Sequence, residues 1–343
     1  MLVFIHELGH FLAAKSVGVR VEKFYIGFNL FGLGWKKVYR GTEYGIGLFP
    51  IGGYVKVAGV IDESFDTGYT GAPDEFRSKK TWQKVWIMSA GVIMNFILAV
   101  VILSHLSYHN GISEADSQAV IGAVAPEYPA EKLGLLGGDE IISINGNSIT
   151  DWESMTGEIH SRPNESVYIS WNRDGQIFAD SVQTTSTPQL IGDKLVELGM
   201  IGIMPVFVNR EIGFIESFQF GAQRTLQLLD LTFRSLKALI KGNVSIQDIA
   251  GPIMIVKIAG ETASAGMDAL LGLMAFLSVN LALINILPIP GLDGGHVVIA
   301  LVEGLIRREL PLNIKLSIQK VGIFLLMILF FTIMVNDIQR LFN

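Results

Sequence analysis

The chain has 343 residues, of which half are hydrophobic and 17% are charged, and its mean hydropathy is +0.45. These values argue against an ordinary soluble protein, because several apolar runs approach the roughly 20 residues that cross a bilayer as a helix. The chain contains no cysteine, which excludes disulfides and thiolate metal sites. Its net charge of −6 gives no reason to expect a nucleic-acid partner.

The first apolar segment, Met1–Val17, carries two histidines and a glutamate. His6 and His10 share one face of a helix, and Glu7 completes the pattern H-E-x-x-H. This spacing suits two zinc ligands and a carboxylate that activates water. The alternative is a pair of histidines packed against polar neighbours, but such side chains are expensive in lipid and usually functional. The segment is short for a span, and we expect about fifteen residues to be missing at its outer end.

The Gly-rich stretch that follows predicts a β-hairpin. Residues Glu43–Ala58 alternate roughly as a strand pair, with Gly52 and Gly53 after Pro50 as the turn. An exposed edge of this hairpin could pair with an unwound substrate helix, which makes Gly52 and Gly53 candidate substrate-binding residues. The alternative is a plain cytoplasmic β-hairpin.

Four apolar segments predict four transmembrane helices, namely Met1–Val17, Val85–Leu106, Met267–Leu287 and Val321–Val335. Charge predicts the topology, since residues 15–84 carry eleven Lys and Arg, whereas residues 105–215 carry five against fifteen Asp and Glu. By the positive-inside rule, residues 15–84 and 303–320 are cytoplasmic, and residues 113–205 and both chain ends lie outside. Leucines mixed with charges at 215–241 predict an amphipathic helix along a surface.

The acidic region between the second and third spans predicts a small β-rich domain. Its strand candidates are Val120–Val124, Glu140–Ile144 and Val167–Trp171, separated by Gly, Pro and Asn. The segment Ala130–Ile149, with its Gly-Asp and Asn-Gly turns, resembles a PDZ domain of the bacterial protease type. Such domains bind peptides by adding a strand to a sheet edge, so a peptide ligand is possible; the alternative is a spacer or filter.

A catalytic zinc ion usually has three protein ligands, and no third histidine follows His10 shortly as it does in soluble metzincins. The best third ligand is Asp293, an acid in apolar sequence that prolines and glycines break. Irregular backbone at membrane depth must be buried in protein or line a cavity, where a metal would compensate the charge. The alternative is an Asp that caps a broken helix, and His296 is expected to pack nearby.

A second histidine pair, His105 and His109, lies at the outer end of the second span. Its spacing is again i, i+4, but no acid stands between the two residues and Glu114 is the nearest carboxylate. We expect these to be interfacial histidines rather than metal ligands.

The two motifs H-E-x-x-H and N-x-x-P-x-P-x-L-D-G, in an early and a late span, resemble the site-2 protease family of intramembrane zinc metalloproteases. A PDZ-like domain between the second and third spans resembles the RseP branch, the regulator of sigma-E protease. The likeness covers nearly the whole chain. It implies that His6, His10 and Asp293 bind one Zn²⁺ per chain, that Glu7 is the catalytic base, and that Asn285 lies near the substrate.

Three features depart from the family pattern. The first helix is short, only one PDZ-like domain fits the length, and Gly91-Val92 stands where the family has Gly-Pro. Asn95-Phe96 follows as in the family, and Asn95 is a further candidate substrate-binding residue. None of these departures affects a proposed ligand.

The predicted fold is a polytopic α-helical membrane protein with about four transmembrane helices, a membrane-reentrant β-hairpin and an inserted extracytoplasmic PDZ-like α+β domain. The expected parts are a first membrane part, the PDZ-like domain, an amphipathic connector and a second membrane part, at residues 1–112, 113–205, 206–265 and 266–343.

The predicted activity is hydrolysis of peptide bonds within or near single transmembrane helices, for example those of anti-sigma factors, in the bacterial inner membrane. The active site is expected toward the cytoplasm. The partners are then single-pass membrane proteins and the lipid bilayer. The alternatives are an inactive PDZ-bearing membrane scaffold and a metal transporter, although a transporter usually shows repeated halves and more spans.

Overall fold

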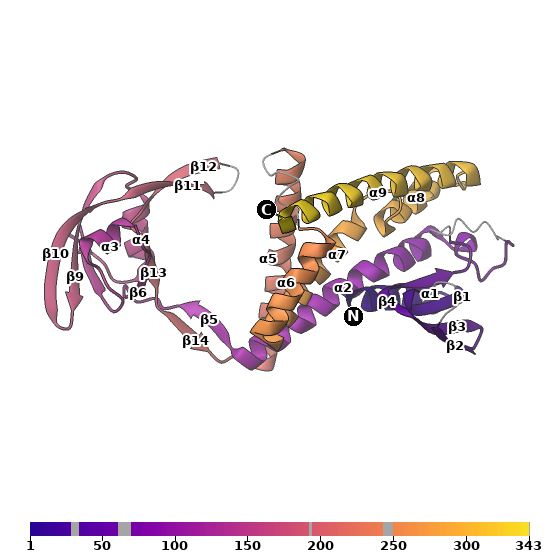
Figure 1. Cartoon of the computed structure of the whole chain (residues 1–343), viewed down its shortest axis with the longest axis horizontal. Coiled ribbons are helices and arrows are strands. Elements are labelled where there is room, and N and C mark those ends of the chain that lie inside the picture. Colours follow the sequence, from indigo (N-terminus) through magenta and orange to yellow (C-terminus); the bar gives the residue numbers. More distant parts are fainter. Residues whose placement is uncertain (29–33, 61–69, 192–193, 243–249, 343) are drawn as a thin grey trace. The chain divides into compact units, whose positions relative to one another are not determined.

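The computed structural model describes residues 1–28, 34–60, 70–191, 194–242 and 250–342. It divides into two compact units. The first comprises Met1–His109 and Gly213–Asn343, and the second comprises Asn110–Ile212. Figure 1 labels their helices and strands.

The helices of the first unit carry most of the apolar sequence. They are α1 (Leu2–Ser16), α2 (Thr81–Asn110), α5 (Phe214–Ile240), α6 (Pro252–Ala265), α7 (Met267–Ile286), α8 (Asp293–Ile306) and α9 (Leu312–Phe342), with a short 3₁₀ turn at Phe76–Ser78. Among the described residues, three helices are long and apolar enough to cross a membrane, namely α2, α7 and α9. Helix α1 has 15 residues, so the four-span count stays a prediction.

A four-stranded sheet packs beside α1. Its strands are β1 (Val21–Phe28), β2 (Gly34–Tyr39), β3 (Thr42–Gly47) and β4 (Phe49–Val57), in the order β2-β3-β1-β4. Strand β1 is parallel to β3 and antiparallel to β4. Buried aliphatic residues join the sheet to α1 and α2, among them Ala13, Val21, Val57 and Ile87.

The predicted hairpin over Glu43–Ala58 is wrong. Strands β3 and β4 do not pair with each other, because β1 lies between them, and the antiparallel hairpin is instead β2–β3. Gly52 and Gly53 lie inside β4 rather than in a turn. The pairing of β1 with β4 shifts register between Ile26 and Phe28. In the facing part of β4, Gly52 has a φ of 80°, a conformation that glycine adopts without steric cost.

Helices α7 and α8 are separated by a break over Leu287–Leu292, as the prolines and glycines of this stretch predict. Gly291 has a φ of 94°. Residues Gly294 and Gly295 let the start of α8 lie against the end of α7, since a Cβ on Gly294 would be 2.1 Å from the Leu287 carbonyl oxygen. The break therefore turns the chain so that Asp293 begins a new helix.

Helix α5 lies against α2 through a stripe of small residues. It buries Ser217, Gly221 and Thr225, and a Cβ on Gly221 would lie 2.2 Å from Ser104 Oγ. Much of its apolar sequence, including Phe218, is exposed. The placement of this amphipathic helix along a membrane surface stays a prediction.

The second unit contains the strands predicted from sequence. A sheet of order β10-β9-β7-β8 is formed by Gln176–Gln183, Ser166–Arg173, Glu140–Ile144 and Asn147–Ser148. Further pairs are β5–β14 (Ile112–Ala115 with Phe207–Arg210), β6–β13 (Ile121–Val124 with Ile203–Pro205) and β11–β12 (Thr185–Ile191 with Lys194–Met200).

Two helices complete this unit, α3 (Pro129–Leu133) and α4 (Trp152–His160). Helix α4 begins with a capping box, in which the Ser154 N–H donates to the Asp151 carboxylate. The core is a cluster of fully buried side chains that includes Ile121, Ile144 and Met155. The unit thus has an apolar core of its own.

Candidate metal centre

Three side chains from two helices converge inside the first unit. His6 and His10 lie on α1, and Asp293 is the first residue of α8. The two Nε2 atoms are 3.2 Å apart, and Asp293 Oδ2 lies 3.1 Å from His6 Nε2 and 3.3 Å from His10 Nε2. Both histidines are buried. Residues nearly 290 positions apart in sequence therefore share one site.

The donor atoms fit a zinc ion. Zinc bonds of about 2.0–2.1 Å in a tetrahedron separate neighbouring ligand atoms by about 1.6 times that length, or ~3.3 Å. The three observed separations lie close to this value. Among the described residues, this is also the group of His, Cys, Asp or Glu that could hold a metal ion.

The hydrogen bond of His10 indicates a cation at this point. His10 Nδ1 lies 2.8 Å from the Ile87 carbonyl oxygen, so Nδ1 carries the proton and donates it. In the neutral ring, Nε2 is then unprotonated, and its lone pair faces the Asp293 carboxylate. Asp293 Oδ2 is buried and has no hydrogen-bond partner. Two acceptors in this position repel each other unless a metal ion or a proton on the ring lies between them.

Asn95, a fully buried residue of α2, contacts the other histidine. Its Nδ2 lies 3.3 Å from His6 Nδ1, and its Oδ1 is buried without a partner. The two ends of an amide are exchangeable in shape. If His6 gives Nε2 to a metal, Nδ1 carries a proton and needs an acceptor, which the exchanged Asn95 oxygen supplies. The structure thus places Asn95 behind a candidate ligand; its predicted substrate contact stays untested.

Glycines let α1 and α2 approach closely enough to form the site. A Cβ on Gly91 would lie 2.4 Å from His10 Nε2 and 2.7 Å from His6 Cε1. A Cβ on Gly9 would lie 2.4 Å from the Ala90 carbonyl oxygen. Gly91 stood out in the sequence only as half of an altered Gly-Pro pair, and its contact with both imidazoles could not be read from that pattern.

Glu7 follows His6 on α1 and is only partly buried. Its carboxylate interacts electrostatically with His10, His6 and Asp293 and faces the backbone N–H of Val55 in β4. Gly53, also in β4, lies next to it, since a Cβ there would be 3.8 Å from Glu7 Cγ. Strand β4 therefore borders the side of the site that carries the free carboxylate.

Asn285, near the end of α7, also reaches the centre. Its Nδ2 lies 3.3 Å from His6 Nε2, and the residue is half-buried. An amide donor is thus present beside the candidate metal position, in keeping with the predicted role of Asn285 near the substrate. Gly52 lies one residue before Gly53 in β4.

The remaining histidines lie elsewhere. His296 lines a separate pocket with residues of α2 and α9. His105 and His109 stack with ring centroids 6.1 Å apart, both exposed, and no described acid joins them in a metal group. Neither arrangement resembles the three-ligand cluster.

One known protein family matches nearly the whole chain. The sequence model described as peptidase family M50 matches residues 1–329. This chain belongs to peptidase family M50, the site-2 protease family. The three proposed ligands, Glu7 and Asn285 all fall within the matched residues of this M50 chain.

Curated relatives match over nearly their whole length. Proteins of Clostridium acetobutylicum and Clostridium perfringens are each 34% identical over 98% of the chain, and cover 94% and 95% of the relatives. One of Campylobacter jejuni is 32% identical over 99% of the chain and 91% of the relative. All three bear the name "Putative zinc metalloprotease". The RseP branch stays a prediction.

Among solved structures, a PDZ domain of an SdrC-like protein from Listeria monocytogenes matches 28% of the chain and 94% of that domain. The identity is 21% and the TM-score is 0.22. A match at this level does not establish a fold, so the PDZ-like character of the second unit rests on its own strands and helices.

Proposed function

We propose that this M50 chain is an intramembrane zinc metalloendopeptidase that hydrolyses peptide bonds within or near the transmembrane segments of single-pass membrane proteins. The observation that carries the proposal is the convergence of His6, His10 and Asp293 at tetrahedral ligand spacing beside Glu7. The site lies among helices of which α2 and α7 have the length and hydropathy of spans.

The proposed ligands are His6, His10 and Asp293. A zinc ion held there would act as a Lewis acid and would lower the pKa of a bound water molecule. Ile87 and Asn95 orient the two imidazoles from behind, as outer partners of zinc ligands do. Glu7 accepts the proton of the attacking water and delivers it to the leaving amine.

The substrate is proposed to enter along β4. This strand lies at an edge of the sheet and borders Glu7 through Gly53 and Val55. An unwound substrate segment that adds to this edge would present an extended peptide bond to the site. Asn285 then donates a hydrogen bond to the substrate carbonyl, and Gly52 and Gly53 leave its backbone unobstructed.

The second unit is proposed to be a PDZ-like domain outside the cytoplasm, where it captures a peptide or limits the size of substrates. What supports this placement is the charge asymmetry, with the acidic stretch in this unit and the basic stretches in the first. Anti-sigma factors fit the substrate class of single-pass proteins in the bacterial inner membrane.

The test of the catalytic base is Glu7→Gln, with Glu153→Gln on α4 as a matched control. We expect Glu7→Gln to retain one zinc per chain by metal analysis while cleavage of a membrane-embedded model substrate falls by about 10²–10⁴-fold. Glu153→Gln should cleave normally. Unchanged cleavage by Glu7→Gln would remove Glu7 from the mechanism.

A second test separates the alternatives. Asp293→Asn should lower zinc content, whereas normal content would require another third ligand. A wild-type protein that binds zinc but cleaves no membrane substrate would favour the inactive scaffold. If the wild-type protein carries zinc into vesicles and the Glu7→Gln variant does so equally well, the transporter would be favoured.

A further inference from the structure

Helix α8 carries the candidate ligand Asp293 at its first position, and little apolar packing holds this helix in place. The structure describes the whole of α8, and its buried residues are Gly294, Gly295, Ala300 and Glu303. Glu303 is therefore the one buried residue of this fully described helix whose side chain is larger than a methyl group. Val297 adds a partly buried contact, whereas Leu305 is exposed. Contact with lipid or solvent does not fix the direction of a helix.

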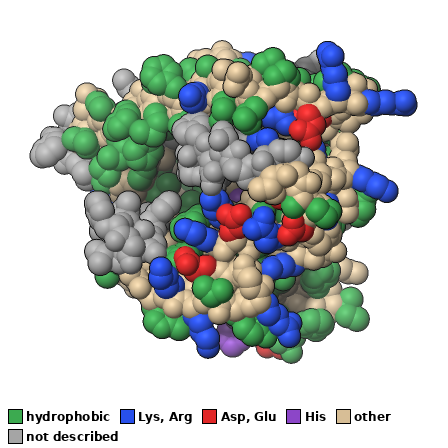
Figure 2. Space-filling view, turned by 90° about the vertical axis from the view of Figure 1, so that its right-hand side faces the viewer, with side chains coloured by type: hydrophobic (Ala, Val, Ile, Leu, Met, Phe, Trp, Pro, Cys, Tyr) green, Lys and Arg blue, Asp and Glu red, His purple; other side chains and the backbone are tan. Residues whose placement is uncertain are grey.

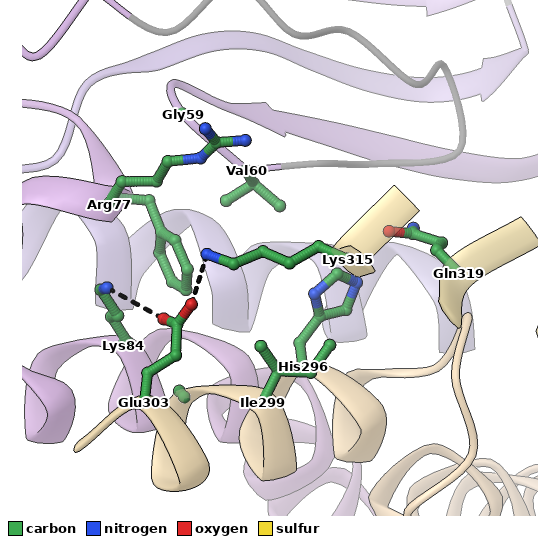
Figure 3. A pocket seen from close by; sticks show the side chains of 11 residues that line it. Gly59, Val60, Arg77, Lys84, His296, Ile299, Glu303, Lys315 and Gln319 are labelled. Atoms are coloured by element: carbon green, nitrogen blue, oxygen red, sulfur yellow. Dashed lines mark ion pairs between the residues drawn. The ribbon is translucent and has the colours of Figure 1, made fainter. Parts of the chain in front are cut away.

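The carboxylate of Glu303, ten residues after Asp293, joins α8 to two other helices. Its Oε1 lies 2.5 Å from Lys315 Nζ in α9 and accepts the Leu310 N–H at 3.0 Å. Its Oε2 lies 3.5 Å from Lys84 Nζ in α2. Figure 3 shows both ammonium groups directed at this carboxylate. One side chain of α8 is thus held by α2, by α9 and by the chain that connects α8 to α9.

Burial distinguishes these ion pairs from those on the surface. Figure 2 shows Lys and Arg side chains spread over the surface at this end of the first unit, with Asp and Glu side chains among them. Ion pairs in water contribute little, because solvent screens them. Glu303, Lys84 and Lys315 are 8%, 7% and 8% exposed. Loss of one partner would leave a buried charge without compensation, so α8 can neither rotate nor slide freely at this end.

The backbone of α8 also touches α2 beside Glu303. A Cβ on Gly304 would lie 2.7 Å from Thr81 Oγ1 and 3.2 Å from Thr81 Cβ. Threonine is β-branched and has few rotamers, so it cannot easily give way. At the other end of α8, Gly294 and Gly295 approach the chain at the end of α7 without a side chain that could interlock with it. The direction of α8 is therefore set mainly at its C-terminal end.

Helix α2 also supports the metal centre from behind. Lys84 lies three residues before Ile87, whose carbonyl oxygen is 2.8 Å from His10 Nδ1. The ion pair of Lys84 with Glu303 therefore joins the helix behind His10 to the helix that begins with Asp293. A change at Glu303 would alter the position of one candidate ligand relative to another.

We propose that Glu303 is a positioning residue, which through Lys84 and Lys315 sets the direction of α8 and so the position of Asp293 Oδ2 at the metal centre. Ten residues of helix span ~15 Å. A tilt of about 4° over this length moves Asp293 by ~1 Å, whereas zinc–ligand distances tolerate only about ±0.2 Å. The inference rests on the proposed function, in which Asp293 binds zinc.

The test uses the full chain in detergent micelles and compares Glu303→Gln with Glu309→Gln. The control makes the same charge change 3.9 Å from Lys84, at a more exposed carboxylate. Chelator competition gives the zinc dissociation constant, and the visible spectrum of the Co²⁺-substituted protein reports the coordination geometry. We expect Glu303→Gln to raise the zinc dissociation constant by about tenfold or more and to change the Co²⁺ spectrum. Glu309→Gln should match the wild type in both.

A role in stability alone predicts a different result. Glu303→Gln would then lower the thermal unfolding midpoint, while the folded protein would keep the wild-type zinc affinity and Co²⁺ spectrum. That outcome would overturn the proposal.

A second variant changes the geometry and leaves every charge in place. Gly304→Ala places a methyl group against Thr81 and pushes the end of α8 away from α2. Gly260→Ala in α6 is the matched control, since a Cβ there meets nothing within 4 Å. We expect Gly304→Ala to bind zinc several-fold more weakly than Gly260→Ala. Should Glu303→Gln not fold, this comparison decides the question, and equal zinc affinities of the two alanine variants would overturn the proposal.

Asp293→Asn distinguishes a failure of this inference from a failure of the proposed function. If Asp293→Asn lowers the zinc content while Glu303→Gln keeps the wild-type affinity, Asp293 remains a ligand and the positioning role alone is wrong. Normal zinc content in Asp293→Asn would instead contradict the ligand set, and the positioning role of Glu303 would fall with it.

Discussion

Replacing Gly91 with alanine adds one methyl group beside both imidazoles of the metal centre. The new Cβ would lie 2.4 Å from His10 Nε2 and 2.7 Å from His6 Cε1. Contacts between such atoms are comfortable at about 3.5 Å, so the rings must retreat by ~1 Å. The atom that must move on His10 is its ligand nitrogen.

A displacement of this size is large for a metal site, because zinc–ligand distances tolerate only about ±0.2 Å. We therefore expect Gly91→Ala to bind zinc at least about 10–100-fold more weakly, comparable to the loss of an outer partner. Overpacking should also destabilise the protein by about 1–3 kcal/mol. Chelator competition gives the zinc affinity, and thermal unfolding gives the stability.

Gly272→Ala in α7 is the matched control, since a Cβ there meets nothing within 4 Å. It should bind zinc normally and be at least as stable as the wild type, because alanine favours a helix more than glycine does. A Gly91→Ala protein with wild-type zinc affinity would refute the proposed ligand geometry, because no room exists for the methyl group while both rings keep their places.

Three further changes probe other parts of the molecule. Asn95→Leu should weaken zinc binding by about 10–100-fold, because the His6 ring loses its hydrogen-bond acceptor. Asn95→Asp keeps an acceptor and should bind zinc more tightly than Asn95→Leu. Equal zinc affinities of the two variants would exclude the hydrogen bond between Asn95 and His6. Met155→Ala, in the core of the second unit, should destabilise that unit by about 2–5 kcal/mol in denaturant unfolding and leave zinc content unchanged. The backbone N–H of Ser154 holds the pKa of Asp151 below its usual value. The stability from this cap is therefore complete above the unfolded pKa of about 3.9 and is lost as the pH falls through the folded value. The protection factors of the α4 amides, which correct each exchange rate for its intrinsic pH dependence, should therefore fall on acidification in the wild type, and Asp151→Asn should lack this change.

Several features of the fold and of the site could be predicted from short stretches of sequence. The spacing of His6, Glu7 and His10 depends only on the period of a helix, so their shared face follows without tertiary information. The break before Asp293 follows from prolines and glycines, whose backbone preferences are intrinsic. Strand Glu140–Ile144 was correct because its turns flank it directly.

The strand order of the first sheet and the role of Gly91 emerged only from the tertiary structure, because both depend on contacts between distant segments. Strand β1 separates β3 from β4. The alternation of apolar and polar residues over Glu43–Ala58 is equally compatible with this arrangement and with the predicted hairpin, so it could not distinguish them. Nothing local distinguishes Gly91 from other helix glycines until α1 packs against it.

The ion pairs of Glu303 in α8 show the same division. Its two partners, Lys84 and Lys315, are 231 positions apart in sequence, and each alone is an ordinary charge at the start of a span. Only the folding of α8 between α2 and α9 brings both lysines to Glu303. Sequence thus determined which residues could do chemistry, and packing determined which of them meet, since packing energy depends on shape and distance rather than on order along the chain.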